Sequence, residues 1–358
     1  MYDLAIIGGG PAGTAAAVTA AHYEARVLLL EKGSFPRNKV CGEFVSAESL
    51  ALLGSLLPTG CDLIARAPRI QRTRVFIENR VLQVPIQPAA ASIARTEFDA
   101  ALWNSARDRG VNAREHQSVV EVEGEGPFTI RTAAEEFTCR SVIDASGRWS
   151  NLNRRENGNG PVKWLGVKAH FREENAAQSV DLYFFKGGYC GVQPVGADRD
   201  NRINVCAMIR SDIGRSLEES FRYHVELKNR SQTWGRLTDV VATSPLLFHD
   251  PMPRRGSILC AGDAAGFVDP FVGDGISLAL RSGALAAGCL RNFIQGNGTL
   301  QQAAQSYDRA YRHELSDIFQ SSSRIRRLFT FPAPIRAGIL YSLTMFPALT
   351  RRMIRNTR

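Results

Sequence analysis

The sequence predicts an α/β fold: a Rossmann-like nucleotide-binding domain, an inserted antiparallel sheet that covers a substrate, and a C-terminal helical tail. Three observations predict it. A glycine-rich turn follows the apolar run of residues 3–7, and a second strand pattern at 257–261 also ends at glycine and acid. Between them, residues 161–210 change to alternating strands with no helical pattern among them.

The first glycine turn has the glycine spacing of a dinucleotide-binding motif. Gly8 takes the tight bend, Gly10 lets the backbone approach a pyrophosphate, and Gly13 permits close packing of the small-residue helix that follows. The free amides of that helix present partial positive charge to the phosphates. The next apolar run, 27–30, ends at Glu31, whose carboxylate is expected to accept the ribose hydroxyls.

The middle of the chain is divided by its periodicity into short elements. Turn formers make residues 32–43 a functional loop. The patterns then predict a helix at 47–57, a hairpin at 74–84 turning near Glu78, a helix at 96–110, and strands at 118–123, 128–132 and 141–144. An antiparallel meander is predicted at 162–171, 180–185, 188–195 and 202–209, followed by helical residues 213–237.

A second segment with a ligand-binding pattern lies far along the chain. The strand at 257–261 ends at Gly262 and Asp263, and a helix begins near Gly275 after Gly273 and Asp274. An acid at the end of a strand can hold a sugar-alcohol hydroxyl. If the ligand is a flavin, the amides of 274–276 would face N1 and C2=O of its ring, where negative charge gathers on reduction.

Charge is concentrated in the tail. The net charge is +9, and residues 324–358 hold eight arginines and no acid, which leaves +1 for the rest of the chain. A nucleic-acid partner is therefore not expected. Apolar side chains between the arginines suit a helix lying on an anionic membrane, and they equally suit a helix packed on the body with a solvated basic face.

Cysteine and histidine usage point to a reduced compartment and to no metal. The seven cysteines contain no Cys-x-x-Cys pair, and no signal peptide pattern opens the sequence. The six histidines have no ligand spacing. We expect a cytoplasmic protein, with peripheral contact at the inner face of the membrane if the tail docks there.

These motifs together resemble flavoproteins of the p-hydroxybenzoate hydroxylase fold, and within them the geranylgeranyl reductase branch. Arg95 matches the family arginine that meets FAD, and residues 144–150 stand at the family's Asp-Gly motif. The resemblance implies that FAD is the cofactor and that it is held by Gly8, Gly10, Pro11, Ala12, Gly13, Glu31, Lys32, Cys41, Gly42, Arg95, Val120, Ala145, Gly262, Asp263, Pro270, Gly273, Gly275 and Ile276.

Two segments point to the branch, and one departs from it. Residues 36–43 are similar to the reductase loop whose cysteine, here Cys41, lies near the flavin, and Gly266 stands where aromatic hydroxylases usually have His. Cys41 is the catalytic candidate, although it also suits a packing role, and Glu43 is expected to be solvated. The reductases' Tyr-x-Trp-x-Phe-Pro pattern becomes the candidate substrate residues Tyr189, Gly191, Gln193 and Pro194, with both large apolar side chains lost.

The resemblance implies an FAD-dependent oxidoreductase, and it leaves the reaction open. The first hypothesis is reduction of a carbon–carbon double bond in a small apolar isoprenoid, quinone or polyketide-like substrate. The rivals are a monooxygenase, a halogenase, whose Trp-x-Trp-x-Ile-Pro signature is absent, and a non-redox flavoprotein. No second Gly-x-Gly-x-x-Gly occurs, so transient NAD(P)H or a protein donor must supply electrons.

The predicted domain boundaries follow from these assignments. The FAD-binding domain takes residues 1–160 and 246–295, with the hairpin of 68–88 joining the substrate sheet. Residues 161–245 form that sheet, and 296–358 form C-terminal helices with the basic apolar tail.

Overall fold

The structure is a computed structural model that describes residues 1–148, 163–196, 201–243, 250–270 and 273–330, together with Leu152, Leu246 and Phe248. Most of the basic tail, residues 331–358, lies outside this part of the chain, so neither reading of the tail is tested. Among the described residues, no helix is both long and apolar enough to cross a membrane.

The first sheet builds the nucleotide-binding half. Its main path runs β16 (Arg254–Arg255), β17 (Ile258–Cys260), β9 (Glu136–Asp144), β1 (Tyr2–Ile7), β2 (Val27–Leu30) and β6 (Asn112–Arg114). All pairs except β16 with β17 are parallel. β7 (Val119–Glu123) and β8 (Phe128–Thr132) extend β9 as an antiparallel flap.

The register of this sheet brings the two glycine turns together. Ile7 pairs with Leu30 on one side and with Asp144 on the other, and Asp144 pairs with Cys260. The carboxyl ends of four parallel strands therefore meet at one edge, where open α/β sheets bind their ligands.

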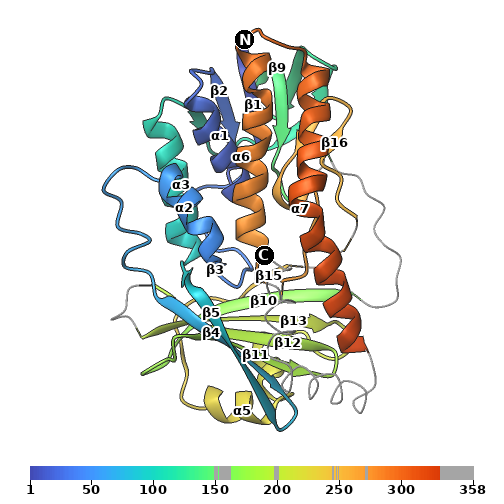
Figure 1. Cartoon of the computed structure of the whole chain (residues 1–358). Coiled ribbons are helices and arrows are strands. Elements are labelled where there is room, and N and C mark those ends of the chain that lie inside the picture. The colour runs from blue at the N-terminus through green and yellow to red at the C-terminus, as the bar shows by residue number, and fades with distance from the viewer. Residues whose placement is uncertain are drawn as a thin grey trace.

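Helices cover this sheet and approach one another closely. They are α1 (Pro11–Ala21), α2 (Ala47–Leu56), α3 (Arg95–Asp108), α6 (Gly275–Ile294) and α7 (Leu300–Thr330), with a 3₁₀ turn at η1 (Gly262–Ala264). α1 and α6 pack so tightly that a Cβ on Gly283 would lie 2.0 Å from the carbonyl oxygen of Ala12. Figure 1 shows α6 and α7 side by side, with α7 running on to the second sheet.

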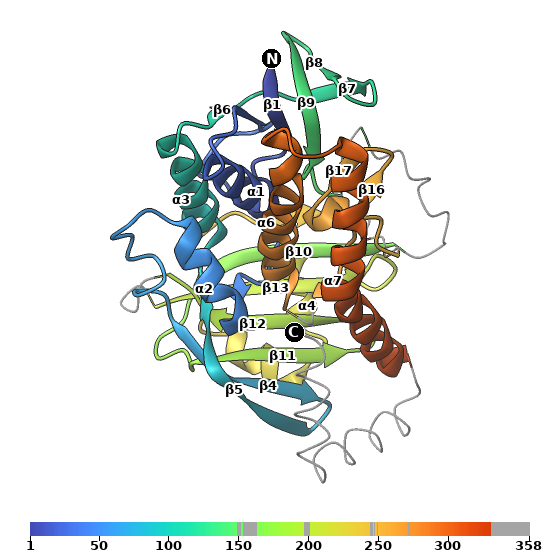
Figure 2. The ribbon, with the colours of Figure 1, turned by 45° about the horizontal axis from the view of Figure 1, so that its top comes forward.

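The second sheet lies across the carboxyl-end edge of the first (Figure 2). Its order is β14 (Gly235–Arg236), β10 (Trp164–Arg172), β13 (Arg202–Arg210), β12 (Gly188–Pro194), β11 (Ser179–Phe185), β4 (Arg69–Ile77), β5 (Arg80–Ser92) and β3 (Phe44–Val45), and β15 (Val241–Thr243) also pairs with β10. The pairs among β10 to β13 are antiparallel as predicted, but only β11, β12 and β13 form a meander, because β10 pairs with β13 and not with β11. The predicted hairpin joins it through β4, which runs parallel to β11.

One helical prediction needs correction. Residues 213–237 form two short helices, α4 (Leu217–Phe221) and α5 (Val225–Ser231), and then the strand β14. A capping box at Ser216 starts α4, and extended backbone at His224 ends it and opens α5. Both helices cover the face of the second sheet that points away from the first, where Leu217, Phe221 and Leu227 join the sheet's apolar core.

Candidate active site

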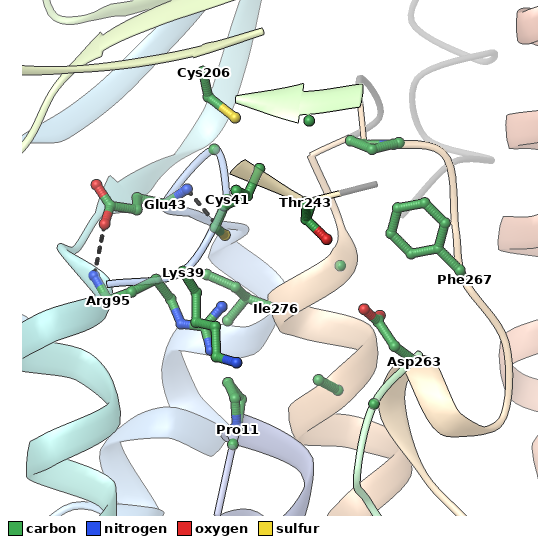
Figure 3. Close-up of a pocket in the computed structure, with 18 of the residues that line it drawn as sticks. Pro11, Lys39, Cys41, Glu43, Arg95, Cys206, Thr243, Asp263, Phe267 and Ile276 are labelled. Carbon is green, nitrogen blue, oxygen red and sulfur yellow. Dashed lines mark hydrogen bonds between the residues drawn. The ribbon is translucent and has the colours of Figure 1, made fainter. Parts of the chain in front are cut away.

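A cavity of about 890 Å³ lies between the two sheets, and both segments predicted to bind the cofactor line it. Its lining includes the first glycine turn, the loop around Cys41, the second glycine segment and one face of the second sheet. Figure 3 shows Pro11 at one end and Cys206 of the sheet at the other, with Cys41 and Asp263 on opposite sides.

The first turn has the predicted geometry. Gly8 has a φ of +104°, and a Cβ there would lie 2.4 Å from the carbonyl oxygen of Ala145. A Cβ on Gly13 would lie 1.8 Å from the carbonyl oxygen of Gly8, so only glycine allows this packing. Gly10 lines the cavity, and a Cβ there would meet no atom within 4 Å, which leaves space for a phosphate. Pro11 and Ala12 line the cavity beside it.

The Glu31 carboxylate accepts hydrogen bonds within the protein that the sequence does not predict. It accepts them from the amides of Gly9 (2.8 Å) and Gly33 (2.9 Å) and forms a bidentate ion pair with Arg37. Burial raises the pKa of Glu31, but Arg37 and the two amides outweigh burial and hold the pKa below its usual value. Glu31 and Lys32 both line the cavity.

Unpartnered buried polar atoms around the cavity fit a polar cofactor. Arg37 Nε, Asn38 Oδ1 and Arg148 Nη1 are buried without a hydrogen-bond partner, and all three residues line the cavity. Buried polar atoms of this kind are costly unless a ligand or water completes them. The open position at Gly10 and these atoms are what a dinucleotide would fill, so the residues fit FAD.

Cys41 and Gly42 lie on the cavity wall next to Arg95. The Cys41 thiol accepts a hydrogen bond from the Glu43 amide at 3.3 Å, and the Asn204 side chain donates to the Cys41 carbonyl at 3.0 Å. The Arg95 guanidinium makes two hydrogen bonds of 2.7 Å to Asp99, and Arg95 lines the cavity as predicted. Cys41 is thus a residue of the cavity wall that is held by its own loop and by β13.

Glu43 is not solvated, and this prediction is wrong. Its side chain is fully buried and contacts Lys168 and His170 of β10. Burial raises the pKa of Glu43, but Lys168 and His170 outweigh it and hold the pKa below its usual value. Sequence reasoning missed the cluster because Glu43 lies more than 120 positions before Lys168 and His170. The alternation of Lys168 and His170 along a strand was the available signal.

The second predicted cofactor-binding segment, which begins at Gly262, lies against the first glycine turn. Gly262 has a φ of +60°, and a Cβ there would lie 2.9 Å from Cβ of Ala12. Burial raises the pKa of Asp263, although Arg148, whose Nε lies 3.5 Å from the carboxylate, opposes this. The predicted cofactor residues of this segment line the cavity: Gly262, Asp263, Pro270, Gly273, Gly275 and Ile276. The amino end of α6 therefore faces the cavity.

Three predicted positions differ in detail. Ala145 lines the cavity, but Asp144 before it is buried against Arg255 at 2.5 Å. Val120 is 50% exposed and Val119 lines the cavity instead, because alternate residues of β7 face opposite ways. Gly266 lies outside the lining, where a Cβ would meet Phe319 at 2.9 Å.

The floor of the cavity is a row of residues that crosses five strands of the second sheet. Cys206 pairs with Gly191, Gly191 with Leu182, Leu182 with Val75, and Val75 with Leu82. All five line the cavity. At about 4.8 Å between strands, the row is about 19 Å long.

The candidate substrate residues lie on or beside this floor. Tyr189, Gly191 and Gln193 line the cavity, and Pro194 does not. The hairpin positions, Thr73, Val75, Leu82 and Val84, were not predicted as site residues. Their alternating pattern was visible in the sequence, but only the pairing of β4 with β11 brings them to the cavity.

Comparisons with known proteins place these features in context. A family model described as an FAD binding domain matches residues 1–320. The chain is 24% identical to a menaquinone reductase of Mycolicibacterium smegmatis, over 92% of this chain and 85% of that protein. It is 26% identical to a digeranylgeranylglycerophospholipid reductase of Methanocella arvoryzae, over 92% and 87%.

Solved structures share the fold. A geranylgeranyl bacteriochlorophyll reductase-like protein of Thermoplasma acidophilum superposes with a TM-score of 0.75 at 21% identity, covering 94% of this chain and 90% of that one. A flavin-dependent brominase superposes with a TM-score of 0.77 at 21% identity, covering 99% and 93%. The chain therefore belongs to the family of FAD-binding domain proteins and is an FAD-dependent oxidoreductase.

Proposed function

We propose that the enzyme reduces a carbon–carbon double bond of an apolar, isoprenoid, quinone or polyketide-like substrate. One observation carries the proposal: the row from Cys206 to Leu82 extends the flavin cavity across the second sheet as a largely apolar floor. Two of the relatives are a menaquinone reductase and a digeranylgeranylglycerophospholipid reductase, and their names support the same substrate class.

Apolar side chains also surround the floor row. Phe184, Met208, Leu246 and Phe267 line the cavity, and Phe267 stacks on Phe248 with ring centroids 5.3 Å apart. Apolar side chains remove water from such a site, which favours an apolar ligand and protects the transferred hydride. No charged side chain lies in the five-residue floor row itself.

The chemistry requires a hydride, a proton and a reductant. FAD held by the residues named above would, once reduced by NAD(P)H or a protein donor, supply the hydride for one carbon of the double bond. In this proposal the Cys41 thiol, which lines the cavity, gives the proton to the other carbon. The second sheet orients the substrate and excludes water during the transfer.

A polar residue on the floor favours the second candidate, a monooxygenase. Gln193 is only 2% exposed and lines the cavity, and its amide donates to the Ser92 hydroxyl at 2.6 Å. Its amide oxygen offers an acceptor to a hydroxyl-bearing ring. An oxygenated aromatic or polyketide substrate would use that contact.

Anaerobic turnover separates the two. Holoenzyme, NADPH or NADH and a panel of isoprenoid, quinone and polyketide substrates are incubated with and without oxygen, and products are identified by mass. The proposal expects a gain of two hydrogens in the absence of oxygen. Product that forms only with oxygen and carries an added hydroxyl would instead establish the monooxygenase.

A further inference from the structure

A buried ionic cluster lies behind the Cys41 loop and outside the cavity chemistry described above. The side chains of Glu43, Lys168 and His170 are 0%, 1% and 2% exposed. The Glu43 carboxylate pairs with Lys168 Nζ through one oxygen and lies 2.8 Å from His170 Nε2 through the other. Glu43 lines the cavity, but Lys168 and His170 do not, so these two residues act on the site through Glu43 and not by contact with substrate.

The cluster joins the two halves of the molecule. Glu43 belongs to the loop before β3, whereas Lys168 and His170 alternate on β10, where they pair with Cys206 and Asn204 of β13. The same Glu43 oxygen that meets Lys168 also accepts the backbone amide of Arg95, at the amino end of α3, at 2.7 Å. A carboxylate is favourable at this end of a helix. Glu43 thus ties the loop to both halves.

These ties restrain the backbone beside Cys41. Glu43 has a φ of +60°, a conformation that non-glycine residues adopt only when the surroundings hold them there. Its amide donates to the Cys41 thiol at 3.3 Å, and its carbonyl accepts the Ile93 amide at 3.0 Å. Asn204, next to His170 in the sheet, holds the Cys41 carbonyl.

We propose that Glu43 is a positioning residue that fixes the Cys41 thiol on the cavity wall through its buried contacts with Lys168 and His170. Removal of one partner from a buried ionic cluster leaves an uncompensated charge or an unmade hydrogen bond. The loop of residues 41–43 then has lower energy when it moves away from β10, and Cys41 moves with it. This role goes beyond the proposed function and holds for either reaction.

The test measures where Cys41 lies rather than what the enzyme turns over. Holoenzymes of wild type and Glu43→Gln are treated with iodoacetamide, and the alkylation rate of each cysteine is followed by peptide mass spectrometry. Cys61, which is exposed, calibrates the reagent, and Cys190, which is buried on the opposite face of the second sheet, reports opening of that sheet. The expected result is a rise of about tenfold in the Cys41-to-Cys61 ratio while Cys190 stays protected.

The matched control is Asp181→Asn. Asp181 is also a buried carboxylate of this sheet, 1% exposed and bound to Arg74 and Arg230, but it lies on the face away from the cavity. The control is expected to leave the Cys41 ratio unchanged. The proposal would be overturned if the Cys41-to-Cys61 alkylation ratio of Glu43→Gln equals that of the wild type. It would also be overturned if Cys41 and Cys190 are both alkylated faster in that variant. If Glu43→Gln does not yield folded holoenzyme, Lys168→Met and His170→Gln are judged by the same two ratios.

Discussion

Arg37 forms a bidentate ion pair with Glu31, the carboxylate at the end of β2 that the glycine motif assigns to the ribose of the cofactor. Together with the amides of Gly9 and Gly33, Arg37 fills all four positions at which a carboxylate accepts hydrogen bonds. A ribose hydroxyl would therefore take the place of one of these contacts. The loop that carries Arg37 is thereby coupled to the adenosine end of the cavity.

Glu31→Ala is expected to weaken FAD binding by about 1 to 3 kcal/mol, because it removes a charged acceptor from the cavity. Titration of apoprotein with FAD, followed by quenching of flavin fluorescence, measures the change. Glu125→Ala, at an exposed acid of the β7–β8 turn, is the control and should bind FAD as wild type does. Equal affinity in the two variants would remove Glu31 from the cofactor site.

Two glycines of the same turn should separate cofactor binding from folding. At Gly10 a Cβ meets no protein atom, so Gly10→Val should cost about 1 kcal/mol of stability at most and block the phosphate. At Gly13 a Cβ would strike the Gly8 carbonyl, so Gly13→Ala should lose about 3 kcal/mol of folding stability.

Thermal unfolding of apoprotein and FAD titration measure the two effects independently. Normal unfolding with no FAD bound is the expected result for Gly10→Val, and early unfolding is expected for Gly13→Ala. A Gly10→Val protein that binds FAD with wild-type affinity would contradict the assignment of the phosphate position.

The sequence allowed prediction of the features that depend on local backbone. The roles of Gly8 and Gly13, the hairpin turn at Glu78 and the start of α6 follow from spacing within a few residues. The register of β1 with β9 and of β9 with β17 then brings the two cofactor-binding segments to the same edge of the sheet, as parallel topology requires.

What could not be predicted depends on long-range pairing. Glu43 was placed in solvent because its loop is rich in turn formers and polar residues, whereas the partners that bury its carboxylate are on β10. The error at Val120 is one position on a strand, which is enough to turn a side chain to the opposite face. The floor positions Val75 and Leu82 needed the pairing of β4 with β11.

The middle of the floor offers a test of substrate space. A Cβ on Gly191 would lie at ordinary contact distance, 3.4 Å, from Leu182, so a larger side chain fits at its base and must extend into the cavity. Gly191→Trp is expected to weaken binding of the apolar probe 1-anilinonaphthalene-8-sulfonate to apoprotein by about tenfold, since indole would occupy the floor.

The control for this change is Gly235→Trp, an exposed glycine of β14 where a Cβ meets no atom and which does not line the cavity. Fluorescence titration compares the two variants with wild type. Probe binding that is lost equally in both variants, or in neither, would argue against the floor as the apolar part of the site.

The last prediction concerns Asp274, which occupies the N-cap position of α6 and is 3% exposed. Burial raises the pKa of Asp274 to about 6, although the hydroxyls of Ser277 and Ser46 oppose the shift. Because the folded protein holds this proton more tightly than the unfolded chain does, the contribution of Asp274 to stability is greatest below about pH 4. It is lost as the pH rises to about 6, by about 3 kcal/mol in total.

Asp274→Asn cannot ionise and should lack this loss. Urea unfolding of wild type and variant at pH 4 and pH 7, with the same FAD concentration, measures the difference. The variant is expected to gain stability relative to wild type between pH 4 and pH 7, because ionisation of the buried carboxyl penalises only the wild type. A difference between the two proteins that stays constant from pH 4 to pH 7 would mean that the folded and unfolded chains bind the same number of protons at Asp274 over this range, and that burial does not raise its pKa.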